Sequence, residues 1–374
     1  MLNKIKVSKS VLDSLEAKAV SKVILEDGYL GMGKKVQEFE EALGVFWGAK
    51  GKVACVNSGT AALHLAVASV TKPKDEVLVQ SMTYVASFQA ISAAGAVPVA
   101  CEVDPLTMTI DLEDAKRRIT KRTRAIMPVH YASDPGDLRE IYKFAKRHHL
   151  RVIEDAAHAF GTRYGKKIIG SFGDIVCFSF DGIKNITSGE GGAVVTADSK
   201  VLQYVRDGRL LGVCKDTRKR YKGLRSWKFE VTAQGYRYHM SNIFAAIGLV
   251  QLKKFPLFKK ARQRLAKRYV VFLKNINGIE VFEKNYDNVV PHIFPIKILH
   301  GKRDKLRQYL DDNNIECGIH YYPNHLLSYY KSRSLPVTEK AYLQLLTLPL
   351  HPDLTIAQQD NIMKIIKNFY AKNI

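Results

Sequence analysis

The sequence predicts an α/β protein with a mostly parallel central sheet, helices on both faces, and a smaller C-terminal α+β domain. Short β-branched runs alternate with amphipathic stretches, which is typical of layered α/β folds. Most of the stretches between the runs are long enough for crossover helices, and parallel strands require such crossovers. With 374 residues, of which 46% are hydrophobic and 25% charged, the chain can bury a core in roughly two domains. A largely disordered protein is excluded.

The predicted strands of the central sheet are Lys52–Val56, Glu76–Gln80, Val97–Val103, Arg124–Val129, Arg151–Ile153, Ile175–Phe180 and Ala193–Thr196. Segments such as Thr60–Val70 and Leu138–His149 have the length and pattern of the helices between them. The last two runs lie closer together in the chain, so a different pairing is open to them.

From about Lys253 the pattern changes to a long basic helix, followed by short strands near Glu280–Phe282 and His292–Leu299 and then by further helices. We therefore place a domain boundary near residue 250. Residues 1–250 form the predicted large domain and residues 251–374 the small one.

The chain is strongly basic, because 58 Lys and Arg against 36 Asp and Glu give a formal net charge of +22. Nucleic acid, an anionic membrane surface or small anionic substrates would each suit such a charge. The densest basic run, Lys253–Lys267, has apolar residues at helical spacing, and we interpret it as the solvated face of a helix. An anion-binding surface is the alternative. No RNA-recognition, zinc-finger or GXXG signature is present, so no nucleic-acid partner is predicted.

The five cysteines have neither the paired spacing of a zinc site nor the density of a disulfide framework. No metal is therefore predicted, and a reducing cytoplasm fits best. The N-terminus lacks the apolar core of a signal peptide. The most apolar stretch, Val53–Val70, is interrupted by polar residues and is not a membrane span. We expect a soluble cytoplasmic protein.

Ligands of open α/β sheets bind beyond the carboxyl ends of the strands, and reactive or anion-binding residues follow several predicted strands here. Ser58-Gly59-Thr60-Ala61 leads a strand into an apolar helix, whose free N–H groups and dipole would hold a phosphate. An ordinary helix cap would give the same pattern. Tyr84 opens the next helix, where it could stack on a planar ligand or simply lie at the surface.

Glu154 and Asp155 leave a buried strand, with His158 three residues beyond Asp155. An acid there suits a cationic partner, although a helix cap and a buried histidine are the alternative. Lys184 lies in a short loop after another strand, ahead of the glycines of Gly189–Gly192. A lysine with a lowered pKa forms Schiff bases with carbonyls, whereas most lysines are only solvated surface residues.

Taken together, a phosphate cradle, an aromatic plate, a carboxylate and an amine are the parts that bind pyridoxal phosphate. The motifs that contain them are Ser58–Leu63, Glu154–His158, and Cys177–Phe180 with Lys184-Asn185. On these motifs the sequence resembles the DegT/StrS family of pyridoxal-phosphate-dependent sugar-nucleotide aminotransferases. The resemblance extends from Gly28–Gly33 to Leu346–Leu350 and implies the fold of the type I aminotransferases.

The resemblance implies that Lys184 is the catalytic residue and binds the cofactor aldehyde, that Asp155 pairs with the pyridine nitrogen, and that Tyr84 stacks on the ring. His158 stands where the family has Gln or His. The full implied cofactor-binding set is Gly59, Thr60, Ala61, Tyr84, Asp155, His158, Ser179, Lys184 and Arg237. The implied substrate-binding residues are Gly31, Met32, Tyr321 and His325.

Arg237 is a departure from the family pattern. Gly235–Met240 aligns with a family stretch that usually reads Gly-Tyr-Asn-Tyr-Arg-Met, whose Asn reaches the cofactor phosphate of the neighbouring subunit. Arg237 replaces that Asn, and a guanidinium there would hold the phosphate or contact the sugar nucleotide. A homodimer with shared active sites is therefore expected. Ser133, where relatives often have Gly, is a second departure, from which the sequence yields nothing further.

The implied reaction moves an amino group from L-glutamate to a nucleotide-linked keto-sugar, with Lys184 shuttling the proton. Lys184–Thr187 followed by Gly189–Gly192 resembles family members that aminate C4 more than members that aminate C3. This resemblance favours a 4-keto-6-deoxyhexose, with C3 as the alternative. The nucleotide, dTDP, UDP or GDP, stays open. The product would serve surface polysaccharides such as lipopolysaccharide O-antigen. The alternative from another class, motivated by the charge, is a non-catalytic regulatory or nucleic-acid-binding protein on the same fold.

Overall fold

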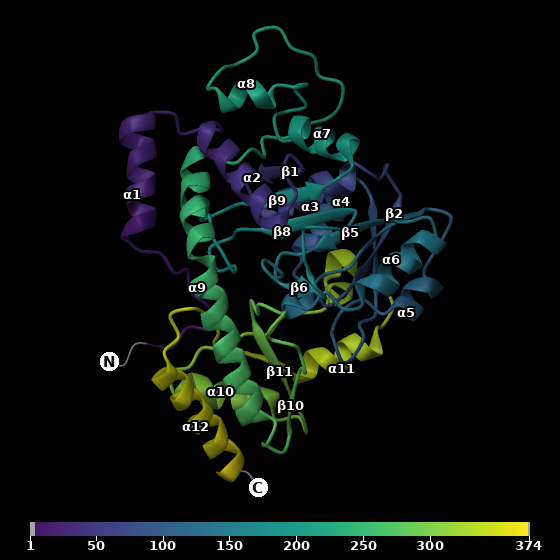
Figure 1. The fold of residues 1–374 in the computed structure, drawn as a ribbon. Coiled ribbons are helices and arrows are strands. Elements are labelled where there is room, and N and C mark those ends of the chain that lie inside the picture. Colours follow the sequence, from purple (N-terminus) through teal and green to yellow (C-terminus); the bar gives the residue numbers. More distant parts are fainter. Residues whose placement is uncertain (1–3, 373–374) are drawn as a thin grey trace.

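The computed structural model describes residues 4–372 and is built around a seven-stranded sheet (Figure 1). Across the sheet the strands follow the order β1-β9-β8-β5-β4-β2-β3. Their bounds are β1 Val53–Val56, β2 Glu76–Gln80, β3 Val97–Cys101, β4 Thr123–Met127, β5 Arg151–Asp155, β8 Ile175–Ser179 and β9 Gly192–Thr196. Every strand predicted for this sheet is therefore present.

The sheet is mostly parallel, as predicted. Neighbours among β2, β3, β4, β5 and β8 pair in parallel, whereas β9 pairs antiparallel with both β8 and β1. The connection between β8 and β9 contains no helix or strand, so the chain returns beside β8 in the opposite direction. That connection contains Lys184.

Helices cover both faces because apolar residues of the strands point alternately to either side. Val53 and Cys55 belong to a core on one face, and Ala54 and Val56 to a core on the other. The first core contains residues of α2 Lys34–Trp47, α5 Leu112–Arg117, α6 Leu138–Arg147 and α9 Asn242–Leu273. The second contains residues of α3 Gly59–Ala68, α4 Ala86–Ala93 and α7 Ser199–Gly208.

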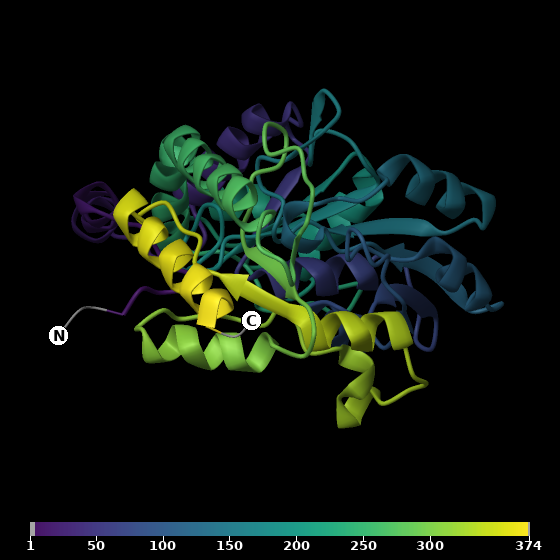
Figure 2. The ribbon, with the colours of Figure 1, turned by 90° about the horizontal axis from the view of Figure 1, so that it is seen from below.

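The C-terminal part contains a three-stranded antiparallel sheet, seen from below in Figure 2. Its elements are β10 Ile279–Val281, β11 Phe294–Ile298, α10 Arg303–Asp312, α11 Pro336–Gln344, β12 Leu345–Leu348 and α12 Ile356–Lys372. The predicted boundary near residue 250 falls within α9, which runs from the large sheet to the small one (Figure 1). The sequence pattern missed β12.

Several short elements complete the fold. They are α1 Ser14–Lys22, the π-helical turn Val23–Asp27, the hairpin of β6 Arg163–Tyr164 and β7 Lys167–Ile168, α8 Thr217–Tyr221, and the 3₁₀ turns Tyr131–Ser133, Asn324–Leu326 and Ser328–Tyr330. Among residues 4–372, no helix is both long and apolar enough to cross a membrane.

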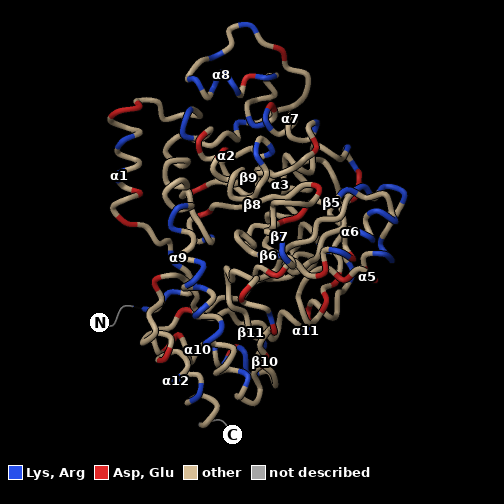
Figure 3. Tube along the Cα trace, viewed as in Figure 1, with Lys and Arg blue, Asp and Glu red and all other residues tan. Residues whose placement is uncertain are grey.

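The basic run on α9 is the solvated face of a helix. Phe258, Leu265 and Tyr269 are buried, while Lys260 and Lys267 are exposed. Lys and Arg occur along α8 and α9 and elsewhere on the trace (Figure 3). The alternation of basic and apolar residues in this run therefore reflects a helix that buries one apolar stripe and exposes its charged face.

A buried ion pair joins α2 to the end of α7. Arg209 is inaccessible to solvent, and its Nη1 lies 2.5 Å from Glu40 Oε1 and 2.5 Å from the Cys55 carbonyl oxygen. The Tyr221 hydroxyl donates to the other Glu40 oxygen. We expect Arg209→Leu to lower the free energy of unfolding by about 3–5 kcal/mol, because the buried carboxylate loses its cation. Urea denaturation measures this loss, and Arg307→Leu on an exposed face of α10 is the control. Equal stability of the two variants would contradict the expectation.

Candidate active site

A cavity of about 460 Å³ lies beyond the carboxyl ends of β5 and β8. It is lined by Ser58, Gly59, Thr60, Leu63, Thr83, Tyr84, Ala86, Val129, Asp155, Ala157, His158, Ser179, Asp181, Ile183, Lys184, Glu190, His292, His320 and Tyr321. Most of the predicted cofactor-binding residues are among them. The cavity therefore lies where open α/β sheets usually bind their ligands.

The start of α3 forms one end of the cavity. Ser58 caps the helix, and its Oγ accepts a hydrogen bond from the Ala61 amide at 3.1 Å. Ala61 is thereby occupied and does not line the cavity, whereas Gly59 and Thr60 do. A Cβ on Gly59 would lie 2.7 Å from the Ser179 Cβ, so only glycine permits this close approach. Early helix N–H groups lack intrahelical partners and favour an anion.

Asp155 ends β5 and is buried in the cavity wall. Its Oδ2 accepts a hydrogen bond from Ser87 Oγ at 2.8 Å, and its Oδ1 accepts one from the Ala157 amide at 3.2 Å. These bonds keep the carboxylate in one orientation. A fixed negative charge in a buried wall favours a cationic group on the ligand.

Lys184 approaches the cavity from the loop between β8 and β9. Burial lowers the pKa of its amine, although the negative charges of Asp181 and Asp155 oppose this effect. The neighbouring Asn185 holds the loop, because its Nδ2 donates to the carbonyls of Phe160 at 3.1 Å and Val290 at 3.0 Å. A lowered pKa increases the fraction of neutral amine, which is the form that attacks a carbonyl.

Aromatic and imidazole rings complete the walls. Tyr84 stands at the rim, 60% exposed, with its ring centroid 5.8 Å from that of Tyr321. The Tyr321 hydroxyl lies 2.9 Å from His158 Nε2. Burial, together with the nearby Lys184, holds the pKa of His158 well below its usual value. His158 is therefore neutral at physiological pH.

Several predicted site residues do not line this cavity. Met32 is buried in the core, and the Gly31 carbonyl accepts a hydrogen bond from the Asn242 amide at 2.9 Å. His325 is fully buried, with Nδ1 2.8 Å from Ser81 Oγ and Nε2 3.1 Å from Glu339 Oε1. Both of its ring nitrogens therefore have partners within the chain.

Arg237 is exposed and lies beside a separate cavity of about 140 Å³, lined also by Asp216, Ser226 and His239. Within one chain it does not reach the cavity that contains Lys184.

The structure adds His292 and His320, which the sequence did not single out. His292 Nε2 lies 3.4 Å from Lys184 Nζ, and burial lowers the pKa of His320 to about 4. His320 directly precedes Tyr321, a predicted substrate-binding residue, so the sequence motif could have indicated its position. His292 follows a proline ahead of β11, and nothing in that local sequence connects it with Lys184.

These groups fit pyridoxal phosphate. The start of α3 suits its phosphate, Asp155 its pyridinium nitrogen, Tyr84 its ring and Lys184 its aldehyde. The lack of a Cβ at Gly59 leaves the approach to Ser179 open, as the cradle requires.

The comparison with known families agrees with this geometry. The model of the DegT/DnrJ/EryC1/StrS aminotransferase family matches residues 11–367. The chain belongs to this family. Aminotransferases of the DegT/DnrJ/EryC1/StrS family depend on pyridoxal phosphate, so the fold class, the enzyme class and the cofactor predicted from the sequence are confirmed.

Individual members of the DegT/DnrJ/EryC1/StrS family are similar along nearly their whole length. The spore coat polysaccharide biosynthesis protein SpsC of Bacillus subtilis is 35% identical over 92% of each chain. Helicobacter pylori PseC, an aminotransferase involved in the biosynthesis of pseudoaminic acid, superposes with a TM-score of 0.91 at 27% identity and covers 99% of this chain and 100% of its own. The PLP-form of Streptococcus pneumoniae Spr1654 superposes with a TM-score of 0.90 at 26% identity, covering 99% and 100%. The chain is a sugar aminotransferase.

Proposed function

We propose that this enzyme transfers the amino group of L-glutamate to a nucleotide-linked keto-sugar, namely a 4-keto-6-deoxyhexose on dTDP or UDP. The observation that carries the proposal is the convergence of Lys184, Asp155 and the start of α3 on one cavity. Bound pyridoxal phosphate supplies an electron sink for the carbon that loses its proton.

The chain's own residues divide the remaining work. The amides at Gly59 and Thr60 and the Ser179 hydroxyl hold the phosphate, and Asp155 keeps the pyridine nitrogen protonated. Lys184 Nζ takes the proton from Cα of glutamate and, in the second half of the reaction, delivers one to the sugar carbon. Tyr321 and the neutral His158 close the cavity wall and exclude water.

The preference for C4 rests on the resemblance of Lys184-Asn185-Ile186-Thr187, followed by Gly189-Glu190-Gly191-Gly192, to family members that aminate C4. Amination at C3 is the alternative. The similarity to SpsC, a spore coat polysaccharide biosynthesis protein, supports a product destined for a surface polysaccharide. Membership of an aminotransferase family favours an enzymatic function over a non-catalytic regulatory or nucleic-acid-binding one. A cytoplasmic location stays a prediction.

Product identification tests the substrate. The full-length enzyme, loaded with pyridoxal phosphate, is incubated with ¹⁵N-labelled glutamate and a panel of 3-keto and 4-keto sugars on dTDP, UDP and GDP. We expect NMR to place ¹⁵N on C4 of a 6-deoxyhexose. Label at C3 alone would support the alternative, and no labelled sugar from any member of the panel would contradict the proposal. A parallel series with alanine and glutamine tests the donor.

We also propose a homodimer in which each active site takes residues from both chains. Trp227 is 94% exposed and Leu25 81% exposed. Other large apolar side chains between positions 211 and 231, and in and beside α1, are exposed as well. Figure 1 shows the loop that follows α8 projecting from the body of the fold. An exposed apolar loop of this kind suits burial against a second copy. Arg237 follows this loop and would then reach the partner's cavity.

Arg237→Ala is expected to weaken binding of pyridoxal phosphate or of the sugar nucleotide about tenfold to a hundredfold, because one charged hydrogen bond is lost. Mixing it with Lys184→Ala protein should restore activity, since some heterodimers would hold one site with neither change. Titration of the cofactor and of the sugar nucleotide, and an activity assay of the mixture, measure the two effects. An active monomer in sedimentation, or no recovery after proven subunit exchange, would contradict the shared site.

A further inference from the structure

A short segment before β11, residues 288–292, crosses from the small sheet to the wall of the active-site cavity. Its backbone is held by hydrogen bonds to residues far away in the chain. The segment donates two of these bonds, from Val290 N to Thr162 Oγ1 at 3.0 Å and from His292 N to Ser133 Oγ at 2.9 Å. Its carbonyl oxygens accept the others: Asn288 O from Arg163 N at 2.9 Å, Val290 O from Asn185 Nδ2 at 3.0 Å, and Pro291 O and His292 O from Arg262 Nη1 at 3.3 Å and 3.1 Å. The 288–292 segment is thus closely positioned against the loop that contains Lys184.

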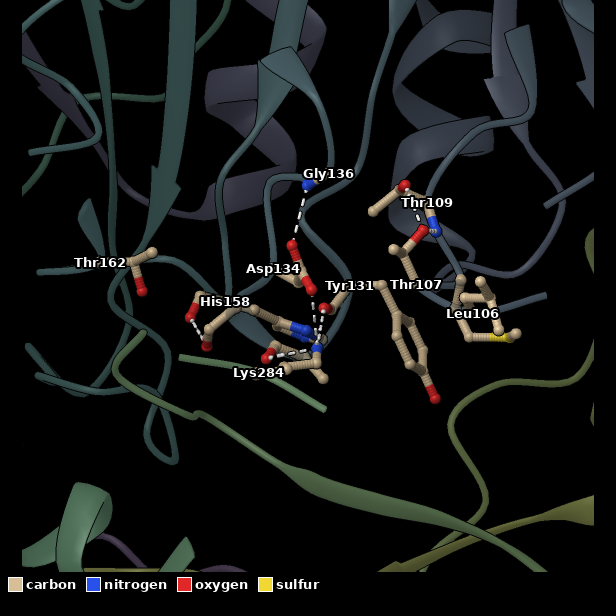
Figure 4. A network of polar contacts seen from close by, with 12 residues as sticks. Leu106, Thr107, Thr109, Tyr131, Asp134, Gly136, His158, Thr162 and Lys284 are labelled. Atoms are coloured by element: carbon tan, nitrogen blue, oxygen red, sulfur yellow. Dashed lines mark hydrogen bonds and ion pairs between the residues drawn. The ribbon is translucent and has the colours of Figure 1, made fainter. Parts of the chain in front are cut away.

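The partner of His292 N, Ser133, belongs to a turn with unusual backbone conformation. Ala132 and Ser133 have φ of 49° and 70°, in the left-handed region that favours glycine. The buried Lys284 stabilises this turn by donating to the carbonyls of Tyr131 at 3.2 Å and Ala132 at 3.4 Å. Lys284 Nζ also forms an ion pair with Asp134 Oδ2 at 3.6 Å. Figure 4 shows these residues together at the turn.

A serine in this conformation contributes what glycine cannot. The Ser133 hydroxyl donates to the His158 carbonyl and accepts from His292 N, so that one buried group bridges two residues of the cavity wall. Figure 4 shows Lys284 and His158 close together around this turn. Ser133 therefore sets the position of His292 relative to His158.

The His292 side chain points at the reactive amine. It is 3% exposed, its Nε2 lies 3.4 Å from Lys184 Nζ, and its Nδ1 has no hydrogen-bond partner within residues 4–372. Burial and the nearby Lys184 hold the pKa of His292 well below its usual value, so the imidazole is neutral. Because an ammonium only donates, Nε2 must accept from Lys184 when the lysine is charged, which assigns the ring proton to Nδ1.

We propose that His292 is a positioning residue that holds the Lys184 amine toward the cavity, and that Ser133 holds His292 in place. The inference rests on the proposed role of Lys184. It gives the Ser133 hydroxyl a function that a glycine at this position would not supply.

The test uses the effect of the imidazole on the titration of Lys184. The other titratable groups that line the Lys184 cavity are unchanged in a His292 variant; they are Tyr84, Asp155, His158, Asp181, Glu190, His320 and Tyr321. Removing an acceptor from the ammonium favours the neutral amine. The rate at which the apoprotein combines with pyridoxal phosphate should therefore rise at a lower pH in His292→Leu than in the wild type.

The full-length apoprotein is mixed with pyridoxal phosphate at a series of pH values, and the visible absorbance of the bound cofactor is followed. For His292→Leu we expect the midpoint of the rate profile at lower pH, and kcat about tenfold to a hundredfold lower with little change in KM for glutamate. His292→Gln, whose amide can occupy the position of Nε2, should restore both toward the wild type. Ser133→Ala should shift the midpoint in the same direction by a smaller amount.

His351→Gln is the matched control, because His351 is also buried with an unpartnered Nδ1 within residues 4–372 but does not line the cavity. Its midpoint should equal that of the wild type. An unchanged midpoint and kcat in His292→Leu, or no recovery in His292→Gln, would overturn this inference alone. A wild-type protein that never gains the absorbance would overturn the proposed function and this inference together.

Discussion

Lys184→Ala is expected to abolish amino transfer, lowering turnover by at least about a hundredfold, because it removes the residue that binds the cofactor aldehyde and moves the proton. The fold should survive. Within residues 4–372 Lys184 forms no ion pair, and its loop is held instead by Asn185 through two carbonyl groups. The loss is thus one of chemistry at a site that keeps its shape.

A turnover assay with the identified sugar nucleotide measures the effect, and circular dichroism checks the fold. Borohydride should link the cofactor irreversibly to the wild type at Lys184 and leave the variant unlabelled. Lys184→Arg is the sharper comparison, since it keeps a positive charge but provides no amine for the cofactor, and it should be as inactive as alanine. Lys305→Ala, on an exposed face of α10, is the neutral control. Activity of Lys184→Ala above a few per cent would assign the catalytic role to another residue.

Asp155→Asn is expected to retain bound cofactor while cutting turnover by about tenfold to a thousandfold, because a nearby carboxylate shifts the pKa of a cationic partner by roughly 1–3 units. The amide has the same shape. Its oxygen can accept from the Ala157 amide and its NH2 group can donate to Ser87 Oγ, which lie 3.2 Å and 2.8 Å from the present carboxylate oxygens. The variant therefore removes the negative charge and largely preserves the geometry of the side chain.

Cofactor titration and turnover measured on the same preparation separate the two effects. Glu154→Gln is the matched control: Glu154 is the adjacent carboxylate on β5, but it accepts a hydrogen bond from the Tyr142 hydroxyl at 2.6 Å and does not line the cavity. It should affect stability more than turnover. Normal turnover in Asp155→Asn would remove that residue from its proposed role.

Most of the large sheet could be predicted from sequence because each strand is a short buried run between turns. The bounds of β2 match the prediction, and β5 extends two residues beyond it, to Asp155. The pattern failed at β12, where Leu345–Leu348 follows α11 directly. A short apolar run without a break before it cannot be distinguished from the end of a buried helix by periodicity.

For the site, too, the sequence predicted some residues correctly and others not. Gly59 and Lys184 follow strands of the large sheet, Asp155 ends another of its strands, and all three residues line the cavity. His325 shares a segment with Tyr321, yet its ring points to Ser81 and Glu339 instead. Side-chain direction in an irregular segment depends on contacts that local sequence does not encode.

The sequence by itself determined the fold class and the residues that meet beyond the strand ends, because parallel strands joined by crossover helices bring their carboxyl ends to one edge wherever they lie in the chain. Only the tertiary structure placed His292 against Lys184 and gave Ser133 its two hydrogen bonds. Ser133 and His292 are separated by 159 positions and come together through the packing of the small sheet against the large one. No local periodicity or spacing in the sequence encodes such a contact, because it depends on how the small sheet packs against the large one.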